Sequence, residues 1–361
     1  MSILSIHQRL ETSGARTALP FRRGNDIWLG VAQLAEDIEG TPPHMNGGNN
    51  DVDALLFRWN DGRFELQARI PAHGGEDIEV FQIGHAVFLA LANLRSGSGP
   101  YEPNVASVIY RWRAGGWEVF QTIDTFAAKQ WRHFTFDGRH FLALAQGLTL
   151  PHLTAVNPAQ SCILEWDGAH FVPFQVLDGM WGYNFTHFTV DGAHYLAYAD
   201  HTSESLVCRW DGRAFVRFQS LSDKGGRAFS HFRWDGTDYL AFARIDGESM
   251  LYRWNGGEFV PYQTLGGPAG REFCVFESGG DLYLVRICFI EGTPADPKSD
   301  LQSELYRWKG DRFVLAETFP TFGGTDAHVF EKNGSRYLVV SNSLTADIRF
   351  RTDTIVYRLG V

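Results

Sequence analysis

The chain has few cysteines and no long apolar run, and these absences exclude several classes of protein. Its four cysteines, Cys162, Cys208, Cys274 and Cys288, form no C-x-x-C pair. They are too sparse for a disulfide-stabilised scaffold, so we expect buried, reduced thiols. A bridge between Cys274 and Cys288 stays an alternative, because both fall on neighbouring predicted strands. No apolar segment reaches the length that a transmembrane helix needs.

Basic charge is also scarce. The formal net charge is −10 and the isoelectric point is about 5.7, which disfavours binding to phosphate backbones and anionic lipid. The N-terminal segment "MSILSIHQRLETSG" has neither the basic start nor the long apolar stretch of a signal peptide. We therefore expect a cytoplasmic protein that binds neither nucleic acid nor membranes.

Familiar catalytic and cofactor motifs are missing as well. The chain contains no G-x-S-x-G elbow, Walker loop or Rossmann fingerprint in a strand–helix context, and no H-E-x-x-H or acidic calcium loop. "GGPAG" at 266 is a turn with no helix after it. No cofactor is expected from these patterns.

What the chain does have is an internal repeat. One motif is written six times, for example as "SVIYRWRAGGWEVFQ" at 107 and "SLVCRWDGRAFVRFQ" at 205, and "TIVYRL" at 354 begins a seventh copy. Each copy is followed by a second motif such as "HFTVDGAHYLAYAD" at 187. Both motifs alternate apolar and polar residues around D-G, N-G or G-G, which is typical of tight β-hairpins. One period therefore holds four strands.

The repeat length predicts a β-propeller. The repeated tryptophans are 44 to 54 residues apart, the size of a four-stranded blade. The N-terminal "LSIHQRL" resembles "FVPYQTL" at 259, so it can supply the outer strand of a blade whose third strand is "TIVYRL". This pairing closes a ring of seven blades and removes exposed sheet edges. We predict one all-β domain over 1–361, with blades at 17–70, 77–123, 131–177, 185–221, 229–265, 273–319, and 327–359 plus 3–10.

The repeats resemble those of a known family. The L-Y-R-W-N/D-G-x-x-F-V-x-x-Q blocks and the F-x-x-x-G-x-x-Y-L-A-x-A blocks are similar to the EPTP (epitempin) or EAR repeats of the leucine-rich glioma-inactivated proteins. The resemblance covers nearly the whole chain and implies a seven-bladed propeller. Family members of animal origin are secreted protein-binding modules. This chain shows no signal peptide or leucine-rich repeats, so their partners are not transferred.

Loop lengths predict a bowl on one face of the ring. The connections between second and third strands are long at 34–52, 94–105, 147–159, 290–302 and 343–353, and short at 201–204 and 245–248. The turns before the innermost strands depart from the family pattern in four consecutive blades, as in "DGMWGYN" at 178. Aromatic rings and guanidinium groups in these turns suit stacking on a ligand and fixing a carboxylate or phenolate. The predicted ligand-binding residues are Trp131, Arg132, Trp181, Tyr183, Phe185, Arg227, His231, Arg271 and Glu272.

Three histidines hold the same repeat position in adjacent blades. His133, His187 and His231 would converge near the axis if they point inward, and three imidazoles could bind a metal ion. The favoured alternative is structural packing, because the other blades have Pro20, Val80, Val275 and Val329 there. The family resemblance also implies a cation of unknown identity in the axial channel, for which Glu79, Glu277 and Glu331 are the matching candidates.

Three functions remain open. The first is binding of a small aromatic or apolar, anionic molecule in the bowl. The second is a cofactor-independent cyclase, lyase or group-transfer enzyme of specialised metabolism, with His187, His133 or His328 as acid or base and Arg227 or Arg271 stabilising negative charge. The third is a protein-interaction scaffold. His152, His201 and Asp223 are further single residues that fall near the predicted rim.

Overall fold

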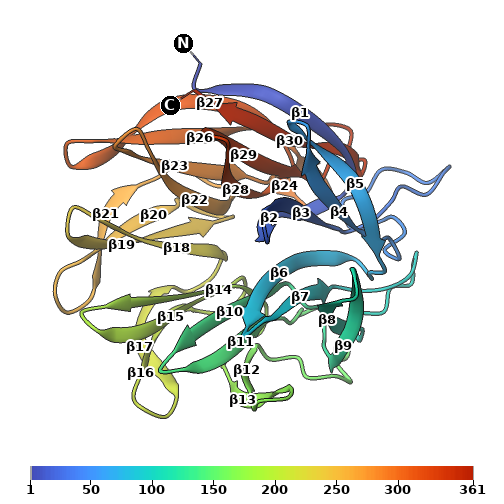
Figure 1. Cartoon of the computed structure of the whole chain (residues 1–361), viewed down its shortest axis with the longest axis horizontal. Coiled ribbons are helices and arrows are strands. Elements are labelled where there is room, and N and C mark those ends of the chain that lie inside the picture. Colours follow the sequence, from blue (N-terminus) through green and yellow to red (C-terminus); the bar gives the residue numbers. More distant parts are fainter. Residues whose placement is uncertain (1, 361) are drawn as a thin grey trace.

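The computed structural model describes residues 2–360 and consists of four-stranded antiparallel sheets arranged around a central axis (Figure 1). Each sheet is one blade, and its first strand is the innermost. Six blades are continuous in sequence, and their strands are listed here from the innermost to the outermost. The first blade has β2 (Ala15–Arg23), β3 (Asp26–Gln33), β4 (Ala54–Asn60) and β5 (Arg63–Ile70), and the second has β6 (Gly75–Ile83), β7 (Ala86–Asn93), β8 (Ala106–Arg113) and β9 (Gly116–Asp124).

The third blade has β10 (Gln130–Phe136), β11 (Arg139–Ala145), β12 (Cys162–Trp166) and β13 (Phe171–Val176), and the fourth has β14 (Gly182–Val190), β15 (Ala193–Asp200), β16 (Ser205–Trp210) and β17 (Phe215–Ser222). The fifth blade has β18 (Gly226–Trp234), β19 (Thr237–Arg244), β20 (Met250–Trp254) and β21 (Phe259–Thr264), and the sixth has β22 (Gly270–Ser278), β23 (Asp281–Cys288), β26 (Asp300–Lys309) and β27 (Arg312–Phe322).

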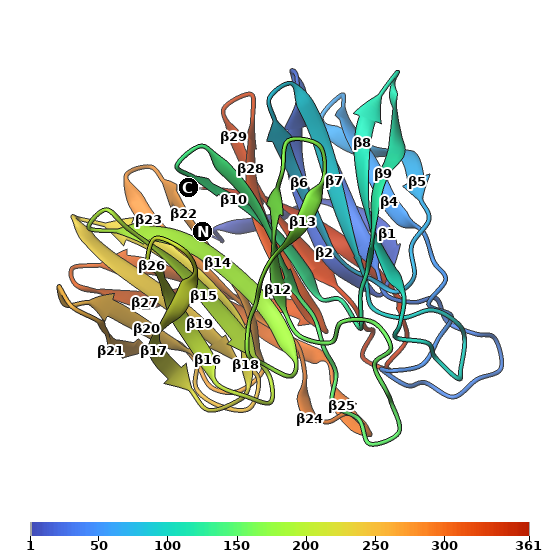
Figure 2. The ribbon, with the colours of Figure 1, turned by 90° about the horizontal axis from the view of Figure 1, so that it is seen from below.

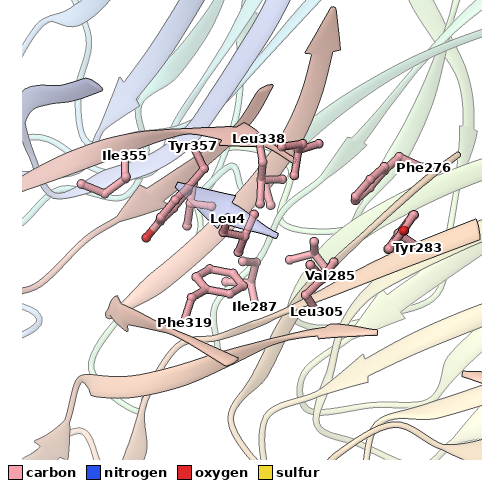
Figure 3. Packing of buried hydrophobic residues seen from close by; sticks show 13 residues of the cluster. Leu4, Phe276, Tyr283, Val285, Ile287, Leu305, Phe319, Leu338, Ile355 and Tyr357 are labelled. Atoms are coloured by element: carbon pink, nitrogen blue, oxygen red, sulfur yellow. The ribbon is translucent and has the colours of Figure 1, made fainter. Parts of the chain in front are cut away.

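The seventh blade joins the two ends of the chain. It comprises β28 (Gly324–Lys332), β29 (Ser335–Asn342), β30 (Arg351–Leu359) and, as its outer strand, β1 (Leu4–Ser13). β1 pairs antiparallel with β30 from Leu4 opposite Leu359 to Ser13 opposite Arg351. Figure 3 shows Leu4 of β1 among Phe319 and Tyr357, in a buried cluster shared with the preceding blade. The seven-bladed fold and its closure by the N-terminal strand are confirmed.

Tight turns explain why the repeats form hairpins. In β14–β15 the turn residues Asp191 and Gly192 have φ angles of 50° and 76°. Two successive positive φ angles define a type I′ turn, whose twist matches that of the strands it joins, and Asp-Gly tolerates it best. The apolar side chains of the strands pack between neighbouring blades. One buried cluster, for example, includes Phe188 of β14 and Phe242 of β19.

A small hairpin, β24 (Glu291–Thr293) with β25 (Asp296–Lys298), interrupts the sixth blade and projects beyond the blade ends (Figure 2). Within residues 2–360 no helix is long and apolar enough to cross a membrane. The four cysteines are unbridged, so the pairing of Cys274 with Cys288 is not formed. Burial raises the pKa of the Cys274 thiol to about 12.

Candidate ligand-binding site

A β-bulge at the start of the inner strands creates the site. In β14 the register with β15 shifts between Gly182 and Asn184, so Tyr183 is an extra, unpaired residue. Equivalent shifts leave Arg227 of β18 and Arg271 of β22 unpaired. A bulged residue escapes the strict alternation of the strand and can be directed away from the sheet. Such bulges occur in six of the seven inner strands, and each directs one side chain toward the axis. In the remaining blade, Lys129 immediately precedes β10 and takes the same place.

Together these side chains form a ring, which we call the axial ring. All of its members line a cavity at the axis. Its composition is four cations, one carboxylate, one phenol and one hydroxyl. The members, in blade order, are Arg16, Glu76, Lys129, Tyr183, Arg227, Arg271 and Thr325.

One carboxylate faces several cations in the axial ring. A Glu76 oxygen lies 3.6 Å from Arg16 Nε and 3.8 Å from Lys129 Nζ, and its other oxygen lies 3.8 Å from Arg271. These contacts are longer than hydrogen bonds, and Arg16 Nε is buried without a hydrogen-bond partner in the described chain. Burial lowers the pKa values of Lys129 and Arg16, although Glu76 opposes the shift. The ring therefore has uncompensated positive charge and unused donors.

Tyr183 lies at the centre of this charge. The guanidinium of Arg227 is 4.1 Å and that of Arg271 4.9 Å from the centre of the Tyr183 ring, and Lys129 Nζ is 5.4 Å away. Burial raises the pKa of the phenol, but these three cations outweigh it, so its pKa lies below the usual value. Burial likewise lowers the pKa of Arg227 to about 10. Each shift indicates that added negative charge at the ring is favourable.

Above the axial ring, at the loop end of the inner strands, lies a cavity of about 500 Å³. Its floor is six members of the ring, all but Thr325. Its walls come from the long loops after β3, β7, β11 and β23, and are largely apolar. Polar side chains of Asn46, Arg95 and His152 also line it. The apolar wall residues are Leu34, Met45, Leu94, Pro100, Tyr101, Pro103, Ala127, Leu148, Leu150, Leu153, Trp181, Phe289 and Pro294.

The segment that includes Trp181 contributes to this upper cavity. Trp181 lines the wall and stacks near Tyr183, with ring centres 6.4 Å apart. His201 packs edge-on against Trp181 at 5.0 Å. Asp200 fixes the turn by accepting a hydrogen bond from the Trp181 backbone N–H at 2.9 Å. The predicted rim residue His152 also lines the cavity, whereas Asp223 is exposed outside it.

Below the axial ring the channel continues as a chamber with acidic walls. Asp77, Glu79, Glu272 and Asp326 line it together with Arg132 and His328. Burial raises the pKa of Asp77 to about 7 and that of Glu272 to about 8. His328 Nε2 lies 3.1 Å from an Asp326 oxygen. Burial alone would lower the pKa of His328, but the Asp326 carboxylate raises it above the usual value.

Two of the predicted ligand-binding aromatics lie elsewhere. Trp131 and Phe185 are fully buried in the clusters between blades and line neither part of the channel. Trp131 and Phe185 each come two residues after a ring member, Lys129 and Tyr183. Strict alternation of side chains along a strand would therefore place both on the face that lines the axis. In β14 the bulge at Tyr183 shifts the alternation by one residue, which directs Phe185 into the core. In β10 the register with β11 is unbroken from Gln130 onward, and Gln130 faces the channel, so the next residue, Trp131, faces the core.

The three equivalent histidines do not converge. Each imidazole stacks on a phenylalanine of the preceding blade: His133 on Phe81 at 4.4 Å, His187 on Phe134 at 4.7 Å, and His231 on Phe188 at 4.4 Å. His187 and His231 line the edge of the lower chamber and His133 does not. Burial lowers the pKa values of His133 and His187 to about 4. Packing explains this repeat position.

The candidate acids for an axial cation are also separated. Glu79 lines the lower chamber, whereas Glu277 and Glu331 are exposed. Glu331 pairs with Arg336 at 3.3 Å. Within the described part of the chain, no group of three or more His, Cys, Asp or Glu residues is placed to hold a metal ion.

The sequence did not predict the ring members Arg16, Glu76 and Thr325. They occur in "TSGAR", "HGGED" and "FGGTD", turns that follow the family pattern, so nothing in them marks a ligand-binding residue. The position in the repeat could have predicted them, because in every blade the ring member is the residue that directly follows the turn before the innermost strand. Loop residues such as Met45 and Tyr101 carried no such signal.

Comparisons with known proteins agree with this architecture. The profile of the EPTP domain matches residues 63–113, 118–167, 170–211 and 214–255, just over half of the chain. A solved structure described as a puromycin-hydrolysing peptidase of Mycobacterium tuberculosis superposes with a TM-score of 0.52 at 10% identity, covering 95% of this chain and 52% of that one. At such low identity the likeness concerns the fold alone. The fold and repeats thus define an EPTP-repeat β-propeller.

The chain belongs to the EPTP family. It is 33% identical over 124 residues to the mouse thrombospondin-type laminin G domain and EAR repeat-containing protein, and 30% identical over 141 residues to the human protein of the same name. These matches cover 34% and 38% of this chain and 18% of each relative. The matched region spans less than a fifth of those relatives.

Proposed function

We propose that this propeller binds an amphipathic anion, with its apolar or aromatic body in the upper cavity and its acidic group on the axial ring. The observation that carries the proposal is that four cations of the axial ring share one ring carboxylate beneath largely apolar walls. Glu76 contacts Arg16, Lys129 and Arg271, and Arg227 lines the same cavity. Pockets of this size with a few convergent polar groups are typical of small-molecule sites. A cytoplasmic location is part of the proposal, and fractionation of the source cells tests it.

An acidic ligand would neutralise positive charge that the axial ring itself leaves uncompensated. Buried cations require compensation by opposite charge or hydrogen bonds. Among the described residues, Glu76 contacts Arg16, Lys129 and Arg271 at 3.6 to 3.8 Å, whereas Arg227 packs on the Tyr183 ring at 4.1 Å. Guanidinium groups bind carboxylate, sulfonate or phosphate with paired hydrogen bonds, which are about twice as strong as neutral ones. A neutral ligand of the same shape would gain only the apolar contacts.

Two fluorescent probes test this difference. 8-Anilino-1-naphthalenesulfonate and N-phenyl-1-naphthylamine share their aromatic skeleton, and only the first carries a sulfonate. We expect saturable one-to-one binding of the sulfonate, and weaker binding of the neutral compound by about tenfold or more. Arg227→Met should reduce sulfonate affinity by a similar factor while leaving the neutral compound unchanged.

Arg233→Met is the matched control, because Arg233 lies on the same inner strand but is half exposed and pairs with Asp238 near the opposite strand end. Its sulfonate affinity should equal that of the unmodified protein. Equal affinity for the two probes, or equal losses in the two variants, would contradict the proposal.

Proton-transfer catalysis is a second candidate, favoured by the His328–Asp326 pair with Glu272 nearby in the lower chamber. An imidazolium beside a carboxyl whose pKa is about 8 can donate or accept protons near neutrality. Histidine nuclear magnetic resonance titration tests whether a ligand on the axial ring reaches this pair. A His328 pKa that the sulfonate probe leaves unmoved would exclude proton transfer to a ligand bound there.

A protein partner is a third candidate, supported by membership of the EPTP family. The matched relatives carry EAR repeats together with a laminin G domain in their names.

A further inference from the structure

Neighbouring blades are joined by a repeated side-chain contact on the outer strands. A glutamine of one blade bonds both backbone groups of the residue that begins the outer strand of the next. The Phe171 N–H donates to Gln121 at 2.9 Å, and the Gln121 amide donates to the Phe171 carbonyl at 2.7 Å. We call this contact the amide latch. It recurs between Gln8 and Phe64, Gln175 and Phe215, Gln219 and Phe259, and Gln263 and Phe313.

The sixth blade uses a carboxylate for the same purpose. Glu317 accepts hydrogen bonds from the backbone N–H groups of Ile3 at 2.6 Å and Leu4 at 3.3 Å, where the outer strand β1 begins. Six of the seven junctions therefore hold an amide or carboxylate at this position.

An aromatic ring accompanies the amide latch. The residue before the glutamine packs on the repeated tryptophan of the next blade: Phe218 lies 6.1 Å from Trp254 and Tyr262 lies 6.5 Å from Trp308, centre to centre. His7, Phe120 and Phe174 make the same contact with Trp59, Trp166 and Trp210. At these five junctions, which we call standard junctions, an aromatic residue followed by glutamine makes the contact with the next blade.

The junction between the blade of β2–β5 and the blade of β6–β9 lacks both groups. Ala68 pairs with Leu56 in β4–β5, as Gln263 pairs with Leu251 in β20–β21. Ala68 therefore occupies the latch position, and the preceding residue, Gln67, occupies that of the aromatic ring. Both are exposed. Across the junction, Trp117 stands where five of the other blades have phenylalanine and the seventh has Leu4.

A cavity of about 300 Å³ opens at this junction. Ala68 and Trp117 both line it, together with Trp28, Tyr110 and Trp112. The indole N–H groups of Trp28 and Trp117 have no hydrogen-bond partner in the described chain, and Trp28 is only 7% exposed. No lining residue carries a carboxylate. The cavity is therefore largely aromatic, and two unpaired indole N–H groups are buried in the tryptophans that line it.

We propose that this junction binds an extended peptide segment in which an aromatic residue is followed by glutamine. The other junctions of the same molecule show which chemical groups fit here, because the backbone of Trp117 holds the register that Phe171 and Phe259 hold elsewhere. The glutamine amide of the partner would accept from the Trp117 N–H and donate to its carbonyl. The aromatic side chain would pack against Trp112. This site is separate from the axial ring and does not depend on the function proposed for it.

Two short peptides test the proposal. N-acetyl-Phe-Gln-amide and N-acetyl-Phe-Leu-amide share the phenylalanine and differ in the second side chain, which ends in a carboxamide in the first and is a branched alkyl group in the second. Titration of ¹⁵N-labelled protein should shift the indole signals of Trp112 and Trp117 saturably with the glutamine peptide, at an affinity about tenfold or more above that of the leucine peptide. Trp117→Phe assigns the indole signal and should keep the binding, since phenylalanine occupies the position in standard junctions.

Ala68→Gln supplies the missing latch from within the chain. It should raise the melting temperature and abolish the response to the glutamine peptide, whereas Arg63→Ala, at an exposed position of β5 that does not line the cavity, should leave the response intact. Absence of saturable shifts, equal affinity for the two peptides, or unchanged binding in Ala68→Gln would each overturn the proposal. If Ala68→Gln fails to fold, the comparison of the two peptides on the unmodified protein decides.

Discussion

Glu272 is a carboxyl group whose environment makes stability depend on pH. Burial raises its pKa to about 8 from an ordinary value of 4.5, and the nearby Asp326 carboxylate adds to the shift. When folding raises the pKa of a group, its contribution to the free energy of unfolding is fully present at pH values below the pKa of the group in the unfolded chain. That contribution is lost as the pH rises through the folded value, because the unfolded chain releases the proton first.

The free energy of unfolding should therefore fall between about pH 5 and pH 9, and Glu272→Gln should reduce the fall. Glutamine cannot ionise, and its carbonyl can still accept the Phe273 N–H that Glu272 accepts at 3.0 Å. Urea unfolding of both proteins at pH 5, 7 and 9 measures the difference. Asp77, whose pKa burial raises to about 7, contributes equally to both and cancels. Parallel pH profiles would contradict the assignment.

At the scale of strands, the amide latches should contribute measurably to stability. Gln219 accepts the Phe259 N–H at 3.0 Å and donates to its carbonyl at 2.7 Å. Gln219→Ala leaves both backbone groups unpaired, which should lower the free energy of unfolding by about 1–3 kcal/mol. Chemical denaturation measures the loss. Gln67→Ala, at an exposed position of another outer strand, should change stability little, and equal effects of the two substitutions would refute the role of the latch.

The strands were predictable from the sequence because alternation and Asp-Gly turns report local geometry directly. The number of blades and the closing strand followed from repeat matching. Three members of the axial ring, Tyr183, Arg227 and Arg271, were among the predicted ligand-binding residues. The complete ring did not follow, because a single bulged residue such as Tyr183 inverts the facing of every residue after it in the register. The same shift explains why Phe185 lies in the core. The wall residues of the upper cavity were beyond prediction, since irregular loops have no periodicity.

For the whole molecule, closure of the ring should control cooperativity. β1 covers the edge of β30, and Leu4 fills the cluster around Phe319 and Tyr357. A chain lacking residues 1–13 exposes this edge and these side chains. It should unfold at lower temperature and associate, as measured by calorimetry and sedimentation.

A permuted chain provides the matched comparison. It begins at Gly14 and carries residues 2–13 after β30 through a short turn, which is feasible because Leu4 lies opposite Leu359. We expect this chain to regain the stability and the monomeric behaviour that the deletion removes. Failure to regain them would show that β1 acts in some way other than by closing the ring. A deletion variant as stable as the full chain would show that closure is not required.

The central claim is that the axial ring holds the acidic group of an amphipathic ligand. A crystal structure of the protein with 8-anilino-1-naphthalenesulfonate tests it most directly. The account predicts the sulfonate within hydrogen-bond distance of Arg227 or Arg271, with the aromatic rings against Leu94 and Tyr101. A probe bound with its sulfonate toward solvent, or bound outside the upper cavity, would contradict it.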